Sequence, residues 1–109
     1  IHSAEMIQAD QILLRFLGVV KNLFLYSQNP AECGFYIEDS LGEDPPYSII
    51  PAPGIPNGLL LTLDREIRGK AFVSFCHKPV PSFIPPVDGV TYLPVLSFYQ
   101  FSVETHGIV

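Results

Sequence analysis

The residue types best suited to catalysis lie near two histidines. His77 directly follows Cys76, and His106 stands two positions after Glu104. If the two strands that carry these residues were adjacent, Glu104 could orient His77 and His106 as a general base, and Cys76 with His106 could form a thiol nucleophile pair. In an extended strand, however, Cys76 and His77 would point to opposite faces. Because the chain also lacks the GxSxG, HExxH, P-loop and GxGxxG motifs, we expect a protein that is not an enzyme.

A second candidate feature is a run of five acidic residues with no basic residue between them: Glu32, Glu38, Asp39, Glu43 and Asp44. Oxygen ligands suit hard cations, but this run lacks the ligand spacing of an EF-hand loop. No cluster of cysteine and histidine has the spacing of a zinc site either. We therefore expect neither metal nor cofactor, and interpret the run as a solvated loop that can dock a basic protein partner.

The basic residues are concentrated in a second short segment. Four of the six lie close together and are interpreted as a charged hairpin tip: Arg65, Arg68, Lys70 and Lys78. An anion site would need a glycine-rich cradle, and Gly69 stands alone. Aromatic residues follow this segment, but stacking on nucleic acid requires a basic face. The net charge of −5 and the pI near 4.9 exclude a nucleic-acid partner.

The predicted partner surface combines the acidic run with aromatic residues of the C-terminal third. Its members are Glu38, Asp39, Glu43, Asp44, Tyr92, Tyr99 and Phe101. We interpret the protein as a small protein–protein interaction module of the inhibitor, immunity, adaptor or assembly-subunit type. The alternative is a small-molecule-binding protein, or an enzyme with a ligand pocket, whose apolar pocket lies between a helix and a sheet.

A long amphipathic helix is predicted over residues 3–26. Polar side chains form one stripe at helical period: Gln8, Gln11, Arg15, Gly18 and Asn22. Apolar residues occupy the opposite side of the predicted helix. A helix that ended at Gly18 would leave residues 19–26 as a strand, and the continuation of the stripe favours the longer helix.

Beyond residue 30 the pattern predicts strands and turns. We expect strands over 34–38, 47–50, 59–63, 71–77, 90–93 and 95–104. Strands 59–63 and 71–77 should form a hairpin that turns at Arg68-Gly69. Proline-rich loops should occupy 51–58 and 79–94. The predicted fold is α+β: one domain over 1–109, with a long N-terminal amphipathic helix on an antiparallel sheet of four to six strands within 34–104.

Composition bears on association and compartment. Only 16% of the 109 residues are charged, against about 25% in typical domains, and residues 79–109 contain only two charged side chains, Asp88 and Glu104. This apolar surplus predicts a homodimer. The apolar stretch 12–26 is short and interrupted by charge, so we expect no membrane partner. Two cysteines are few for a small secreted domain, so Cys33 and Cys76 are interpreted as thiols of a cytoplasmic protein rather than a disulfide.

Overall fold

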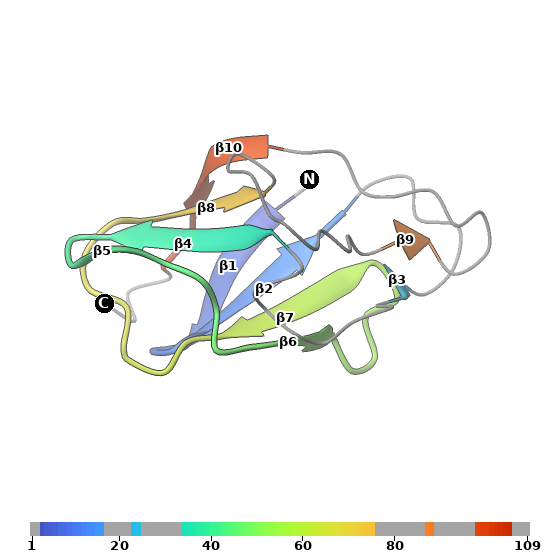
Figure 1. Ribbon diagram of the computed structural model, residues 1–109. Helices are drawn as coiled ribbons and strands as arrows, with labels where there is room; N and C mark the ends of the chain where they lie inside the picture. The colour runs from blue at the N-terminus through green and yellow to red at the C-terminus, as the bar shows by residue number, and fades with distance from the viewer. Residues whose placement is uncertain (1–2, 17–22, 25–33, 76–86, 89–97, 106–109) are drawn as a thin grey trace.

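The computed structural model describes residues 3–16, 23–24, 34–75, 87–88 and 98–105 (Figure 1), and all its regular elements there are strands. These strands are β1 (Ser3–Gln8), β2 (Gln11–Arg15), β3 (Leu23–Phe24), β4 (Phe35–Asp39), β5 (Gly42–Asp44), β6 (Ser48–Pro51), β7 (Gly58–Thr62), β8 (Ala71–Phe75), β9 (Val87–Asp88) and β10 (Phe98–Val103).

The strands form two four-stranded antiparallel sheets that pack face to face. The first sheet has the order β1-β2-β7-β6 and the second has the order β10-β8-β4-β5, while β3 and β9 form a separate pair. Figure 1 shows the second sheet above the first. Alternate side chains of both sheets meet in one buried cluster that includes Met6, Ile12, Leu61, Phe35, Val73 and Phe75. This arrangement is a β-sandwich, in which inward and outward residues alternate along each strand.

One side of the sandwich is joined by backbone hydrogen bonds between the two sheets. The Met6 amide donates to the Glu104 carbonyl at 2.8 Å, and the Glu104 amide donates to the Ala4 carbonyl at 2.9 Å. These bonds pair β1 with the residue that follows β10. At this point the edge of β1 and the end of β10 form hydrogen bonds with each other. Fewer unpaired backbone amides and carbonyls are therefore exposed at these two sheet edges.

The predicted helix over residues 3–26 is wrong, and with it the predicted α+β class. Residues 3–8 and 11–15 form the β1–β2 hairpin, with Ala9 and Asp10 as its turn. Ala4 and Met6 are buried while Ser3 and Glu5 are partly exposed, which is the alternation of a strand. The polar stripe crossed the turn, so residues of two strands mimicked one helical face. Packing against the second sheet outweighs helix propensity here.

The predicted hairpin of strands 59–63 and 71–77 is also wrong, although both strands exist. β7 pairs with β2 and β6 in the first sheet, whereas β8 pairs with β4 and β10 in the second. The segment between them, residues 63–70, crosses from one sheet to the other. It is anchored by the Leu63 and Ile67 amides, which donate to the carbonyls of Asp10 and Ala9 at 2.8 Å.

Other predicted elements agree with the structure. Strands near 34–38, 47–50 and 95–104 correspond to β4, β6 and β10, and Gly69 has a φ of 73°, as a turn at Arg68-Gly69 requires. The strand predicted over 90–93 lies outside the described residues, as does most of the loop predicted over 79–94. In the described part of the chain, no helix is long and apolar enough to cross a membrane.

Candidate interaction surface

A polar cluster with several side-chain hydrogen bonds is built around Arg65, which lies in the connection between β7 and β8. Its guanidinium donates to both carboxylate oxygens of Asp39, at 2.7 and 3.0 Å. It also donates from Nη2 and Nε to Asp44 Oδ2, at 3.0 and 3.3 Å. Because Asp39 ends β4 and Asp44 ends β5, Arg65 ties the β4–β5 hairpin to the segment that links the sheets. Bidentate pairs of this kind are short and directional.

The Asp39 side chain is fully buried, with 0% of its surface exposed. Burial by itself would raise the pKa of Asp39. Hydrogen bonds from the Arg65 side chain and from the backbone amides of Arg68 and Leu41 outweigh burial and hold the pKa of Asp39 below its usual range. The hydrogen bonds of Arg65 to Asp39 and Asp44 raise the pKa of Arg65. Asp39 therefore holds the local fold, with its carboxylate buried against Arg65.

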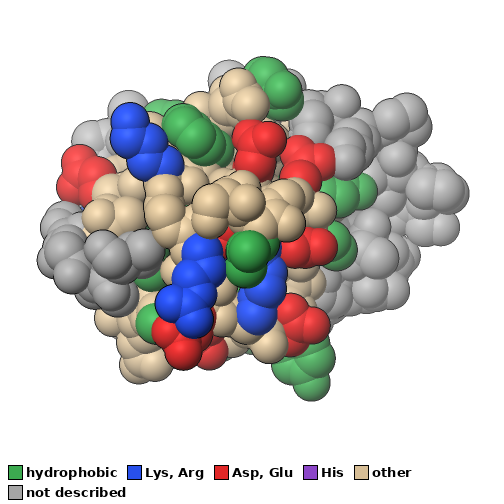
Figure 2. All heavy atoms as spheres, turned by 90° about the vertical axis from the view of Figure 1, so that its left-hand side faces the viewer, with side chains coloured by type: hydrophobic (Ala, Val, Ile, Leu, Met, Phe, Trp, Pro, Cys, Tyr) green, Lys and Arg blue, Asp and Glu red, His purple; other side chains and the backbone are tan. Residues whose placement is uncertain are grey.

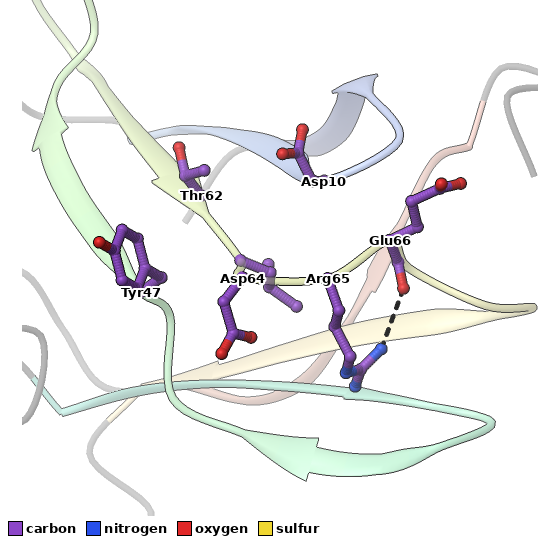
Figure 3. A pocket seen from close by; sticks show the side chains of 7 residues that line it. Asp10, Tyr47, Thr62, Asp64, Arg65 and Glu66 are labelled. Carbon is purple, nitrogen blue, oxygen red and sulfur yellow. Dashed lines mark hydrogen bonds between the residues drawn. The ribbon is translucent and has the colours of Figure 1, made fainter.

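Beside this cluster lies a hollow of about 590 Å³ with Tyr47 on its rim (Figure 3). Its lining comes from the end of β7 and from three connections, and consists of Asp10, Tyr47, Thr62, Leu63, Asp64, Arg65 and Glu66. A second hollow, of about 430 Å³, includes Asp44 and shares Tyr47, Asp64 and Arg65 with the first. We call Asp10, Asp44, Tyr47, Asp64 and Glu66 the Tyr47 surface.

Tyr47 is the most exposed large hydrophobic residue in the described part of the chain, at 72%. Its backbone is nevertheless fixed, since its amide donates to the Thr62 carbonyl at 2.7 Å. Pro45 and Pro46 precede it, and Pro46 is buried. Two consecutive proline rings restrict the backbone dihedral angles. The aromatic ring is therefore presented to solvent from a rigid segment.

The carboxylates around the hollow do not converge on one point. In Figure 3 the Asp64 carboxylate points away from Asp10, and Glu66 extends in a third direction. Among the described residues no group of three or more histidine, cysteine, aspartate or glutamate side chains could hold a metal ion. Separated carboxylates make a broad negative surface rather than a chelating site.

The whole end of the sandwich carries both signs of charge, with acidic groups in the majority. Figure 2 shows Lys and Arg side chains near the middle of this face, with acidic side chains above, below and beside them. Arg65 adds little positive charge to the surface, because Asp39 and Asp44 already bind its guanidinium. Arg68 and Lys70 remain exposed at the turn before β8.

The structure keeps the four predicted acidic residues together on β4 and β5 and places Tyr99 and Phe101 on β10 of the same sheet. Glu38 and Glu43 face each other across β4 and β5 on the outer side of the second sheet, and Glu38 accepts a hydrogen bond from Gln100 Nε2 at 2.9 Å. Tyr99 is 64% exposed. Phe101 packs against the core. Tyr92 lies outside the described residues.

Sequence reasoning missed Tyr47, Asp64 and the role of Arg65. The proline pair before Tyr47 was a usable signal, because a rigid approach to an aromatic residue is typical of a presented side chain. No local sequence pattern predicted that Arg65 would bind Asp44 and Asp39, which lie 21 and 26 positions earlier in the chain. The residues considered for catalysis are Cys76, His77, Glu104 and His106, and all of them except Glu104 lie outside the described part. Cys33 lies outside it as well.

Comparison of the chain with protein families, with curated proteins and with solved structures finds no match in any of the three.

Proposed function

We propose that this protein is a non-enzymatic protein-binding module whose Tyr47 surface takes a basic segment of its partner. The observation that carries the proposal is an aromatic ring, 72% exposed and held by a rigid backbone, on the rim of a hollow lined by carboxylates. Tyrosine is enriched among the residues that dominate binding energy, and a negative surface selects a positive partner.

Charge and shape support a polypeptide rather than a small metabolite as the ligand. Both hollows lie at the surface around Tyr47, and charged side chains make up much of their lining. Both hollows are open to solvent, whereas pockets for small molecules enclose the ligand. The alternative pocket between helix and sheet loses its basis, because the N-terminal segment forms β1 and β2.

Tyr47 should also bind cations directly. A lysine or arginine side chain over a tyrosine ring gains about 0.5–2 kcal/mol, depending on desolvation. Asp64 lines both hollows with Tyr47. A basic side chain seated there would contact the ring and a carboxylate together.

The proposal is tested with a panel of synthetic peptides of equal length that are basic, neutral or acidic, titrated while amide NMR shifts are followed. We expect basic peptides alone to shift the resonances of residues 44–47 and 62–66, with an affinity that falls as salt is added. Tyr47→Ala should weaken binding about 30-fold, as removal of a dominant contact does.

Tyr99→Ala is the matched control, since it removes another exposed tyrosine from β10, the edge strand of the second sheet that lies farthest from β5. It should leave peptide affinity unchanged. Binding of no basic peptide, or equal affinity for Tyr47→Ala and the parent protein, overturns the proposal.

We also propose a cytoplasmic location, which rests on cysteine usage alone. A secreted domain of this size usually carries several disulfides, and this chain has two cysteines. Thiol titration of the denatured protein from its native source should find both cysteines reduced. A Cys33–Cys76 disulfide in that sample would contradict the location.

A further inference from the structure

The outer face of the first sheet carries a register row that crosses all four strands and is aliphatic on three of them, β2, β7 and β6. In register, Glu5 of β1 lies opposite Leu13 of β2, Leu13 opposite Leu60 of β7, and Leu60 opposite Ile50 of β6. The neighbouring register row, from Met6 to Ile49, belongs to the core, so this row faces outward. Leu60 and Ile50 are partly exposed and supply the accessible part of this row. Leu13 is only 5% exposed, although it lies outside the core cluster. We call Leu13, Leu60 and Ile50 the Leu60 row.

The rest of this face carries almost no net charge. One flank of the Leu60 row is uncharged and polar, and its Gln11 side chain donates to Thr62 Oγ1 at 3.3 Å. On the other flank Arg15 lies 3.7 Å from Glu5. Among the paired residues of this face, Glu5 and Arg15 are the charged ones, and their charges cancel.

The corresponding row of the second sheet is different. It runs from Glu43 through Glu38 and Phe72 to Ser102, again across four strands. Two carboxylates lie side by side in it. Two copies of the chain that approached through this face would bring four carboxylates together, which opposes association.

Pairing through strand edges is disfavoured where the structure describes those edges. β10 carries a bulge between Phe98 and Phe101, with Gln100 at a φ of 51°. β5 has only three residues, and β6 ends in Pro51. Bulges, short strands and prolines are the features by which sheet edges avoid pairing with other chains.

We propose that two copies of this chain associate through the outer faces of their first sheets, with the Leu60 rows in contact. A two-fold interface places the same patch on both copies, so the patch must complement itself. A chain with a net charge of −5 meets that requirement only where its surface is neutral. The Leu60 row and its flanks satisfy it. The proposal is independent of the Tyr47 surface, which lies at the loops at one end of the sandwich.

The test is the molar mass of the protein by sedimentation equilibrium over a wide concentration range, with matched variants. Leu60→Glu places a carboxylate at the centre of the row and should weaken the dimer at least about 30-fold, as loss of a central contact does. Phe72→Glu is the control, because Phe72 is half-buried at the equivalent position of the second sheet. It should leave the dimer intact.

A mixing experiment separates loss of the interface from loss of folding. Leu60→Glu and Leu60→Lys should each be monomeric, and an equimolar mixture should restore the dimer through opposite charges across the contact. A monomeric parent protein at the highest concentration, or a Leu60→Glu variant that dimerises like the parent, overturns the proposal. Variants at Tyr47 should leave the molar mass unchanged, so this proposal and the proposed function can fail separately.

Discussion

The outer faces of the two sheets occupy equivalent positions on one sandwich and differ in chemistry. The first sheet presents Leu13, Leu60 and Ile50 across its centre, with one balanced ion pair. The second sheet presents two adjacent carboxylates with Phe72. Inward residues of both sheets belong to the same apolar core. The difference shows that strand alternation fixes the fold, whereas the outward residues determine what each face can bind.

The ion pairs of the two sheets also differ in burial, because Asp39 is buried against Arg65 whereas Glu5 and Arg15 are both partly exposed. The largest predicted effect tests this difference in burial. Asp39→Ala should lower the free energy of unfolding by about 3 kcal/mol, because it leaves the Arg65 guanidinium without its buried partner. Denaturant titration measures the loss. The matched control, Glu5→Gln, breaks the exposed pair with Arg15 on the first sheet and should cost less than about 1 kcal/mol. Equal losses for the two variants would show that the Arg65 cluster is not special.

Acid stability should depend on the same carboxylate. Because the pKa of Asp39 is lower in the folded protein than its ordinary 3.8, its contribution is complete above that value and is lost as the pH falls through the folded value. Asp39→Asn should therefore flatten the acidic limb of the stability profile, measured by thermal unfolding between pH 2 and 7. An acidic limb as steep as that of the parent protein would assign acid unfolding to other groups.

The smallest effect concerns the adjacent carboxylates of the second sheet. Like charges directly opposite each other on neighbouring strands destabilise a sheet, so Glu38→Gln should raise the free energy of unfolding by about 0.5 kcal/mol. The glutamine oxygen can still accept the hydrogen bond from Gln100. Glu5→Gln on the first sheet should shift stability in the opposite direction. If both variants shift stability in the same direction, the charge contrast between the faces has no energetic consequence.

The positions of the strands could be predicted more easily than the neighbouring strands with which they pair. Leu59–Leu63 and Ala71–Phe75 are apolar runs bounded by turn residues, so their extended conformation could be predicted from local sequence. Their assignment to different sheets depends on contacts with β2 and β4, from other parts of the chain. No local pattern reports such pairings, and a charged connection between two strands is typical of a hairpin as well as of a crossover.

The helix predicted for the N-terminal segment was wrong for a different reason. Gln8, Gln11 and Arg15 have helical spacing, and a two-residue turn at Ala9-Asp10 preserves that spacing by coincidence. The alternation of Ala4 and Met6 with Ser3 and Glu5 was the correct signal, but it extends over too few residues to compete. In the candidate site, the sequence could not distinguish the two aspartates of the acidic run. Only the fold shows that Asp39 is buried while Asp44 remains half exposed.

The contrast between the two faces is tested most directly by amide NMR shifts of the parent protein as a function of its own concentration. We predict shifts that grow with concentration at Leu13, Ile50 and Leu60, and none at Glu38, Phe72 and Ser102. Shifts confined to the second sheet, or none at all in a protein that stays monomeric, would contradict the account.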